Sequence, residues 1–359
     1  MANFPELTSP SLEPNSEPSG SSARSKENEG WSGMQRTAIQ PVVSVIVVTY
    51  SSSDELPDCM AGLLKQSVPI EIFLVDNASP DNSAQMVADY GSRFENVHAI
   101  LNEQNIGLAA GNNTPMGKCR GRYLLMLNPD TLFRNDNTLE HMVEFLERNQ
   151  DVGVVGPKNV YANGEPLRSF ERSWGLWDIV KWRVIPNRFP RSLYDRFSSY
   201  KTQDVLFVSG SCLLIRRNIF EQIGGYDPEY FLTIEDVCDL CIRVKQVGSR
   251  VVFLGEEEVV HFSGRSVEHA PHIGVESGNR STVYHFLKHK GRAQALAATF
   301  LLLSAATARV AIATVRGVTS QRYRNIARIY ARIVRSLVVD NPIWSKRSNF
   351  PPSSKNGAN

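Results

Sequence analysis

The stretch that decides the fold is VVSVIVVTY, residues 42–50, with its partner IEIFLVDNAS, residues 70–79. Both are runs of β-branched and other apolar residues, typical of parallel strands covered on both faces. Helical and strand-like patterns alternate around them. Repeated β-α-β units predict an α/β fold with a doubly wound, mostly parallel, Rossmann-like sheet, and ligands at the carboxyl ends of its strands. Helices are expected at 56–66, 83–90, 108–118, 139–149, 237–246 and 282–290, and strands at 97–101, 123–127, 152–155 and 251–254.

Composition divides the chain into three segments. The first is rich in Ser, Pro, Glu, Asn and Gly and is expected to be a disordered leader. The α/β pattern follows, and an apolar, arginine-rich segment with helical character ends the chain. The expected organisation is a leader (1–40), an α/β domain (41–290) with two halves (41–156 and 157–290), and a helical tail (291–359).

Charge is distributed unevenly along the 359 residues, of which 42% are hydrophobic and 21% charged. That composition excludes a wholly disordered chain, a collagen-like repeat and a polytopic membrane protein. From Gly291 onward there are eleven Lys and Arg and one acid, a formal charge of +10, against −8 for the preceding residues. Such a tail is expected to meet an anionic surface.

The cysteines and the N-terminus bear on the compartment. Five scattered cysteines do not make a disulfide framework, and the one C-x-x-C, Cys238 with Cys241, is expected to pack in the core. The first residues lack the pattern of a secretory signal peptide. We therefore expect a reducing compartment, most simply the cytoplasm.

The tail predicts contact with a membrane. Residues 293–308 are uncharged but number only 16, short of the roughly 20 needed to span a bilayer. Arg309 and Arg316 follow, and RYRNIARIYARIVRS, residues 322–336, repeats arginine at near-helical spacing. This pattern favours peripheral attachment to anionic headgroups on the cytoplasmic face. A true span with Arg309 reaching the interface and a soluble helical pair remain open alternatives.

Polar residues at two strand ends are candidates for donor binding. Asp76 and Asn77 end the second strand, where a carboxylate can accept hydrogen bonds from a nucleobase or ribose, or can serve as a helix cap or turn acid. NEQNIGLAAGNN, residues 102–113, supplies Gly107 and Gly111 where a strand gives way to a helix. Small residues there admit a phosphate ligand to the backbone, or simply allow close helix packing.

Acids and a histidine follow later strands. LLMLNPDT, residues 124–131, ends in Asp130, which suits a divalent cation such as Mg²⁺ or Mn²⁺, or an ordinary turn. FLTIEDVCDL, residues 231–240, places Glu235 and Asp236 before a helix, as a general base or as acids that stabilise the helix dipole. His261 is either a metal ligand or a structural histidine.

A second histidine pair is assigned to the surface. His285 and His289 have i, i+4 helical spacing, but they lie among Lys288 and Lys290. The expectation is a solvated basic face.

Taken in order, these segments resemble family 2 glycosyltransferases with a GT-A fold, notably the rhamnosyltransferase-like branch. NIGLAAGNN resembles the family's N-x-G-F-A-x-G-x-N stretch, LNPD that branch's version of the D-x-D metal motif, and GGYDPEYF with the following ED the acceptor-side segment that carries the base. The resemblance covers residues 42–266 and implies that 41–156 is the nucleotide-sugar-binding half of the domain and 157–290 the acceptor and catalytic half. It implies that a metal is held by Asp130 and His261, and that the catalytic residues are Asp236 and Glu235, with Asp239 the less favoured candidate. The residues that it implies for nucleotide-sugar binding are Thr49, Tyr50, Asp76, Asn77, Asn105, Gly107, Gly111, Asn113 and Asn128.

Two departures from the family pattern stand out. The family reads E-D-V-D-L-C, whereas Cys238 is inserted here to give EDVCDLC. One added residue rotates a helix by about 100°, so either Asp236 or Asp239 is displaced. Asp236 keeps its spacing from residues 224–231 and is therefore the expected base. Pro115 also stands where the family tends to have glycine.

The implied activity is that of an inverting hexosyl or deoxyhexosyl transferase in cell-surface polysaccharide synthesis. The donor would be a dTDP-, UDP- or GDP-linked sugar, the acceptor a glycan or a lipid-linked glycan, and no nucleic-acid partner is expected. A base must take the proton of the attacking hydroxyl, a metal would stabilise the departing diphosphate, and direct displacement inverts the anomeric centre. A degenerate, non-catalytic glycan- or membrane-binding module of the same fold is the alternative. A nucleotidyltransferase is disfavoured because TYSSSDELPD, residues 49–58, lacks a glycine-rich basic loop.

Overall fold

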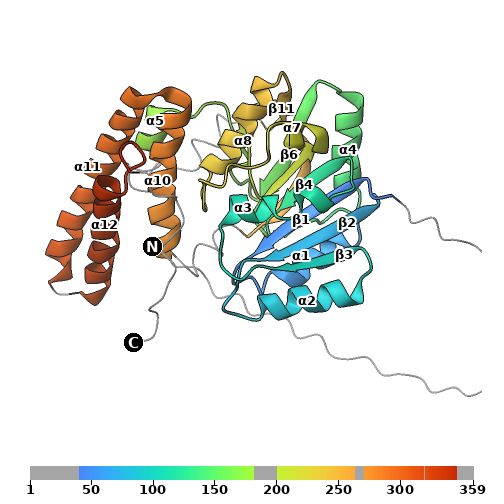
Figure 1. The fold of residues 1–359 in the computed structure, drawn as a ribbon, viewed down its shortest axis with the longest axis horizontal. Coiled ribbons are helices and arrows are strands. Elements are labelled where there is room, and N and C mark those ends of the chain that lie inside the picture. Colours follow the sequence, from blue (N-terminus) through green and yellow to red (C-terminus); the bar gives the residue numbers. More distant parts are fainter. Residues whose placement is uncertain (1–39, 182–199, 263–270, 319, 346–359) are drawn as a thin grey trace, which may run out of the picture. The chain divides into compact units, whose positions relative to one another are not determined.

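The computed structural model describes residues 40–181, 200–262, 271–318 and 320–345 (Figure 1). The leader expected at the N-terminus lies outside the described residues except for Gln40, as does the end of the chain after Ser345.

A nine-stranded sheet forms the centre of the fold, in the order β3-β2-β1-β4-β10-β6-β11-β5, with β8 paired to β11. The first four strands of that order run parallel, as expected, whereas β10 runs antiparallel to both β4 and β6. The α/β class is confirmed, and the sheet is mixed beyond β4. The strands are β1 (Val43–Thr49), β2 (Ile70–Asp76), β3 (Val97–Leu101), β4 (Tyr123–Leu127), β5 (Thr131–Leu132), β6 (Val152–Val160), β8 (Gln203–Asp204), β10 (Cys212–Arg216) and β11 (Arg250–His261), with β7 (Phe170–Glu171) and β9 (Phe207–Val208) forming a separate pair.

Helices cover both faces of the sheet, which explains why every residue of β1 is buried. One apolar cluster joins the sheet to α1, α2 and α4, and the other joins it to α8 and the C-terminal helices. The helices of the domain are α1 (Leu56–Leu63), α2 (Ser83–Arg93), α3 (Leu108–Asn113), the 3₁₀ helix η1 (Met116–Lys118), α4 (Thr138–Arg148), α5 (Leu176–Ile179), α7 (Arg217–Gln222) and α8 (Glu235–Gln246).

Several elements differ from the expectation, among them α10 (Pro271–Lys290), which begins eleven residues before the expected helix at 282–290. The helix expected at 108–118 is divided into α3 and η1, because Pro115 lacks the N–H that a continuing helix requires. Strands β6 and β11 are longer than expected. β11 continues through the three glutamates 256–258 by a register shift between Leu254 and Glu258, which places charged side chains at an irregularity of the ladder.

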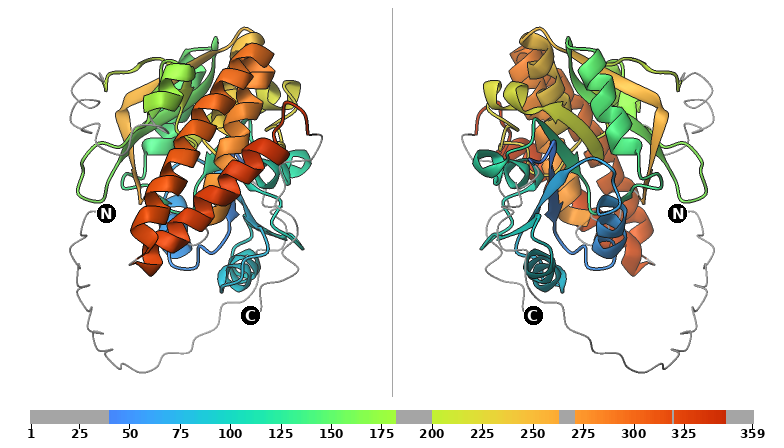
Figure 2. Two further views of the ribbon diagram at one scale, coloured as in Figure 1. Left: turned by 90° about the vertical axis from the view of Figure 1, so that its left-hand side faces the viewer. Right: turned by 90° about the vertical axis from the view of Figure 1, so that its right-hand side faces the viewer.

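Three helices end the described chain and pack side by side (Figure 2): α10 (Pro271–Lys290), α11 (Arg292–Gly317) and α12 (Gln321–Val339). Gly291, at φ +83°, joins the first two, and this left-handed conformation favours glycine. α11 is 26 residues long, more than the expected apolar stretch, because the helix continues past Arg309. By length and composition α11 alone, among the described helices, could cross a membrane. One of its faces is nevertheless buried against α10 and α12, through residues such as Ala298 and Leu302.

Candidate active site

A cavity of about 220 Å³ lies at the carboxyl ends of β1, β2 and β4, where the topology places ligands. Seven of the residues expected to form the site line it. They are Tyr50, Asn77, Asn105, Gly107, Asn128, Asp130 and His261. Val48, Ser52, Leu108, Pro129, Phe231 and Leu232 complete the lining.

The turn after β4 and the end of β11 place Asp130 beside His261. Strand β5, which follows the turn, pairs antiparallel with β11, so that Thr131 lies opposite His261. The backbone N–H of Phe262 donates to the carbonyl of Asp130 at 3.0 Å. His261 Nε2 consequently lies 3.2 Å from Asp130 Oδ1, although the two residues are far apart in sequence.

One oxygen of the Asp130 carboxyl is poised to accept a ligand. The residue is only 4% exposed, and its Oδ1 is buried with no hydrogen-bond partner among the described residues. A buried, unsatisfied carboxylate oxygen is unusual in a folded protein. A carboxylate oxygen suits Mg²⁺ or Mn²⁺, and an imidazole nitrogen suits the transition metal Mn²⁺ better than Mg²⁺. Asp130 and His261 supply one donor of each type, and among the described residues no group of three or more acidic, histidine or cysteine side chains could hold a metal ion.

The opposite wall of the cavity is built around Asn77 and Gly107. Asn77 Nδ2 donates to the carbonyl of Gly107 at 3.1 Å, and Asn105 Oδ1 accepts from the N–H of Gly107 at 3.0 Å. Gly107 has φ +86°, and a Cβ there would meet the carbonyl oxygen of Phe231 at 2.7 Å. Glycine at this position therefore leaves room for Phe231. The carbonyl of Phe231 accepts a hydrogen bond from the N–H of Leu108, and this bond joins the wall around Gly107 to the segment before α8.

Four of the expected donor-binding residues lie behind the cavity wall and do not line it. Thr49 Oγ1 donates to Asp76 Oδ1 at 2.9 Å, and both oxygens of Asp76 also accept from Ser79. A Cβ on Gly111 would meet Val48 at 2.8 Å, which identifies a close packing contact there. Asn113 bonds to the backbone N–H and C=O of Tyr226. These side chains hold the loops that carry the lining residues.

Helix α8 begins with three buried carboxyl groups, which do not line the cavity. Glu235 accepts from the hydroxyls of Thr233 and Thr282, the latter at 2.5 Å. Asp236 accepts from the N–H of Val237. Burial, followed by the charges of Glu235 and Asp239, raises the pKa of Asp236 to about 8.

Asp239 is in a different electrostatic environment. It is fully buried, and its two oxygens contact Arg243 at 2.8 Å, Lys288 at 2.6 Å and His289 at 2.7 Å. Burial raises its pKa, but the hydrogen bond from His289 and the charges of Arg243 and Lys288 together lower that pKa to about 2. Asp239 therefore acts as the counter-ion of these cations, whereas burial beside two other acids holds the pKa of Asp236 at about 8.

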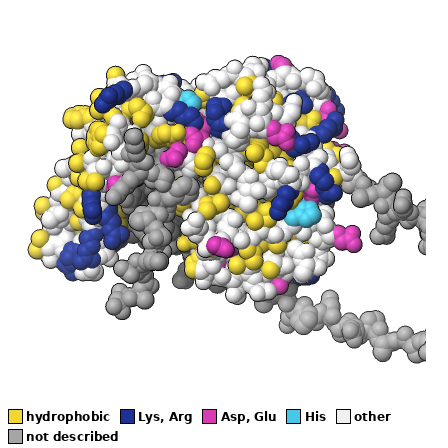
Figure 3. Space-filling model, in the orientation of Figure 1, with side chains coloured by type: hydrophobic (Ala, Val, Ile, Leu, Met, Phe, Trp, Pro, Cys, Tyr) yellow, Lys and Arg dark blue, Asp and Glu magenta, His cyan; other side chains and the backbone are white. Residues whose placement is uncertain are grey.

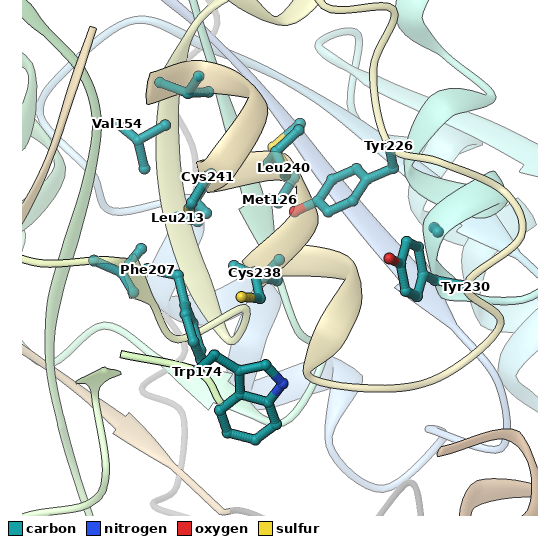
Figure 4. Packing of buried hydrophobic residues seen from close by; sticks show 14 of the residues in the cluster. Met126, Val154, Trp174, Phe207, Leu213, Tyr226, Tyr230, Cys238, Leu240 and Cys241 are labelled. Carbon is teal, nitrogen blue, oxygen red and sulfur yellow. The ribbon is translucent and has the colours of Figure 1, made fainter. Parts of the chain in front are cut away.

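The inserted Cys238 is absorbed into a regular helix. α8 is continuous from Glu235, and the N–H of Cys238 donates to the carbonyl of Ile234 within its first turn. Figure 4 shows Cys238 and Cys241 on α8 among buried apolar residues such as Phe207. The expectation that this C-x-x-C packs in the core is confirmed, since all five cysteines are free and buried.

The expected solvated face of His285 and His289 is wrong. His285 is fully buried, with Tyr230 Oη 3.4 Å from its Nδ1 and Cys238 Sγ 3.8 Å from its Nε2. The side chain of His289 is 8% exposed because it faces Asp239. Burial lowers the pKa of His285 to about 3, so the residue is neutral. The sequence showed i, i+4 spacing but not that α8 lies against this face of α10.

Several residues that line the cavity were not among the expected site residues, for example Ser52, Phe231 and Leu232. Phe231 and Leu232 stand beside the expected acids, but apolar residues at that place are typical of a core. The one feature of the sequence that could have indicated their role is their place between the turn at residues 224–230 and α8.

The sheet order and the place of the cavity agree with the class that the motifs resemble, the glycosyltransferases with a GT-A fold. A profile described as "Glycosyl transferase family 2" matches residues 44–224, just over half of the chain. The chain therefore belongs to glycosyltransferase family 2, as its motifs indicated.

Relatives and solved structures agree with this family. The chain is 27% identical over 270 residues to the N-acetylglucosaminyl-diphospho-decaprenol L-rhamnosyltransferase of Mycobacterium tuberculosis, covering 70% of this chain and 86% of that one. It is 27% identical over 168 residues to poly(ribitol-phosphate) beta-N-acetylglucosaminyltransferase TarS of Staphylococcus aureus, covering 46% of this chain and 29% of the relative. The mannosyltransferase PcManGT of Pyrobaculum calidifontis, solved with GDP-Man and Mn²⁺, has a similar fold, with a TM-score of 0.54, 20% identity, and coverage of 86% of this chain and 89% of that one.

Proposed function

We propose that this glycosyltransferase inverts the anomeric centre as it moves a hexosyl or deoxyhexosyl group from a nucleoside diphosphate to a glycan or lipid-linked acceptor in cell-surface polysaccharide synthesis. The observation that carries the proposal is the buried Oδ1 of Asp130, which has no hydrogen-bond partner among the described residues and lies 3.2 Å from His261 Nε2 in a cavity at the carboxyl ends of the strands. The names of the Mycobacterium rhamnosyltransferase and of TarS support the acceptor class.

The donor would lie in the cavity between two walls. Asn77, Asn105 and Gly107 present amide and backbone groups to the nucleotide from one wall. Asp130 and His261 would hold Mg²⁺ or Mn²⁺ on the diphosphate from the other. When bound, the metal stabilises the charge that develops on the leaving diphosphate.

Asp236 is proposed as the base that removes the acceptor's proton. Its raised pKa lets it hold a proton near neutral pH, and it must lose that proton before it can accept another. Turnover is therefore expected to rise as the pH approaches about 8. Asp130 is the one carboxylate among the described residues that line the cavity, so the described lining offers no second carboxylate as a nucleophile for double displacement.

A donor panel tests this function. The purified full chain is incubated with dTDP-rhamnose, UDP-N-acetylglucosamine and GDP-mannose, with Mn²⁺ or with excess EDTA, and release of the nucleoside diphosphate is measured. We expect one donor class to be consumed with Mn²⁺ only. Full activity in EDTA would reject the metal role, and donor binding without turnover in the presence of candidate acceptors would favour the non-catalytic alternative.

We also propose that the C-terminal helices attach the enzyme peripherally to an anionic membrane surface on the cytoplasmic side. α11 exposes apolar side chains, among them Phe300 at 70% and Val315 at 75%. Figure 3 shows apolar side chains over this part of the molecule, with lysine or arginine side chains at its lower end. The exposed arginines of α12 are Arg322, Arg324, Arg328, Arg332 and Arg335.

Point variants test the attachment better than truncation. Deleting the tail would uncover the core, because Ile333 and Leu337 are buried in the same cluster as α8. Replacing Arg328 and Arg332 by Gln should reduce co-sedimentation with phosphatidylglycerol vesicles. The matched control replaces Arg122 and Arg148, exposed arginines of the sheet domain, and should not. If the intact protein does not bind these vesicles, the attachment is rejected.

A further inference from the structure

The chain has a second cluster of charged groups, where α10 meets α8 and the turn before it. Lys288 Nζ lies 2.6 Å from Asp239 Oδ1 on α8 and 2.6 Å from Asp227 Oδ2 in the turn. Tyr284 Oη, one helical turn earlier, donates to the same Asp227 oxygen at 2.9 Å. α10 thus connects two segments that lead to the cavity, since Phe231 and Leu232 lie between Asp227 and α8.

The cluster surrounds the proposed base electrostatically. The charged and titratable groups around Asp236 and Asp239 come from three segments. They are Glu235 and Arg243 on α8, Tyr226 in the turn before it, and Lys288 and His289 on α10. Asp239 is fully buried and close enough to raise the pKa of Asp236. A cation that neutralises Asp239 therefore favours the ionised form of Asp236.

We propose that Lys288 is a positioning residue for the reaction, which bridges Asp227 and Asp239 and thereby fixes both the place and the protonation of Asp236. Lys288 is suited to this because it pairs with two acids from different segments, whereas Arg243 pairs with Asp239 of its own helix and otherwise donates to the backbone carbonyls of Ile223 and Gly225. The side chain of Lys288 is 27% exposed, and both of its acids are more buried, at 15% and 0%. The inference rests on the proposed role of Asp236, but its first test requires no substrate.

That first test is a titration of the Asp236 carboxyl by ¹³C NMR in the full chain, with the resonance assigned by its loss in Asp236→Asn. The wild-type carboxyl should titrate near pH 8. Lys288→Met should move this titration upward by roughly half a pH unit or more, because Asp239 loses part of its neutralisation. Lys288→Arg should restore the wild-type value. Lys290→Met, which removes an exposed charge from the same helix, should leave the titration unchanged.

A second variant keeps the test decisive if Lys288→Met does not fold. Lys288→Gln keeps a polar side chain that can donate a hydrogen bond to Asp227 or Asp239 but removes the charge, so the titration of Asp236 should again move upward. An unchanged titration in a folded Lys288→Met or Lys288→Gln would overturn the proposal.

The kinetic test uses Mn²⁺-dependent hydrolysis of whichever panel donor is consumed. Lys288→Met should lower kcat about threefold or more at pH 7, leave the donor KM within about twofold, and move the rising limb of the pH–rate profile upward with the NMR titration. A wild-type protein that consumes no donor contradicts the proposed function, while the NMR titration still decides the role of Lys288. A loss of stability alone would lower the active fraction without moving the profile.

Discussion

Two buried aspartates, one on each side of this molecule, have opposite surroundings. Asp130, in the cavity, has an oxygen without a hydrogen-bond partner among the described residues, and a histidine beside it. Asp239, between α8 and α10, contacts two cations and a histidine. A carboxylate whose bonds are satisfied by the protein stabilises the fold, whereas one left unsatisfied beside a cavity is available to a ligand. Asp236 belongs to neither kind, because no counter-ion among the described residues matches its burial and its pKa rises.

The largest expected effect is on turnover, from Asp236→Asn. Removing the base should lower kcat by roughly 10²–10⁴ while leaving nucleotide binding nearly intact, because only proton removal is lost. Steady-state kinetics with the consumed donor, together with calorimetric binding of the nucleotide, measures both quantities. An active Asp236→Asn beside a fully folded but inactive Asp239→Asn would show that Asp239 is the base.

Asp130→Ala should lower turnover by roughly 10²–10³ and weaken Mn²⁺-dependent binding of the nucleoside diphosphate, because the ion loses a ligand. Asp136→Ala removes an exposed acid that follows the same turn and serves as the control. Equal activity of Asp130→Ala and the control would show that Asp130 is an ordinary turn acid and not a metal ligand.

Asp236→Asn should also change how stability depends on pH. The unfolded carboxyl ionises near its ordinary 3.8, while the folded one stays protonated until about pH 8. The folded state therefore binds more protons between these values, and the contribution of this group to stability, present below about pH 4, is lost as the pH rises through 8. Relative to wild type, the variant should gain on the order of 1 kcal/mol per pH unit over that window. Urea unfolding at pH 5, 6 and 7.5 measures the difference, and a difference that does not change with pH would argue against a buried, protonated Asp236.

Asp239→Asn should act in the opposite direction and by less. Its folded pKa of about 2 lies below the ordinary 3.8, so its contribution to stability is present above pH 4 and is lost as the pH falls through 2. The variant should lose about 2 kcal/mol at pH 7, a shift of nearly two pKa units converted to free energy. Urea unfolding of Asp239→Asn beside the exposed control Asp136→Asn measures this loss. A variant as stable as wild type would mean that the cations of α10 and α8 do not need this acid.

The sequence by itself determined the donor half of the fold and most of the cavity. β1 and β4 are continuous apolar runs that are buried along their whole length, and β3 is the edge strand; all three lie within a residue of the expected bounds, and the polar residues after β1 and β4 reach the same edge of the sheet. The local sequence pattern was sufficient to predict these strands. The order of the motifs, through the family resemblance, also placed Asp130 and His261 in one site.

Only the tertiary structure decided what lies against α8. Helical spacing shows which residues share a face but not whether that face meets solvent or another helix, so His285, Lys288 and His289 read as a basic surface. The packing of α10 on α8 buries the side chains of the two histidines near Asp239. It also gives Asp236 and Asp239, three residues apart, pKa shifts in opposite directions. Charges in a buried interface depend on their neighbours in space, and those neighbours come from segments 50 residues away in the chain.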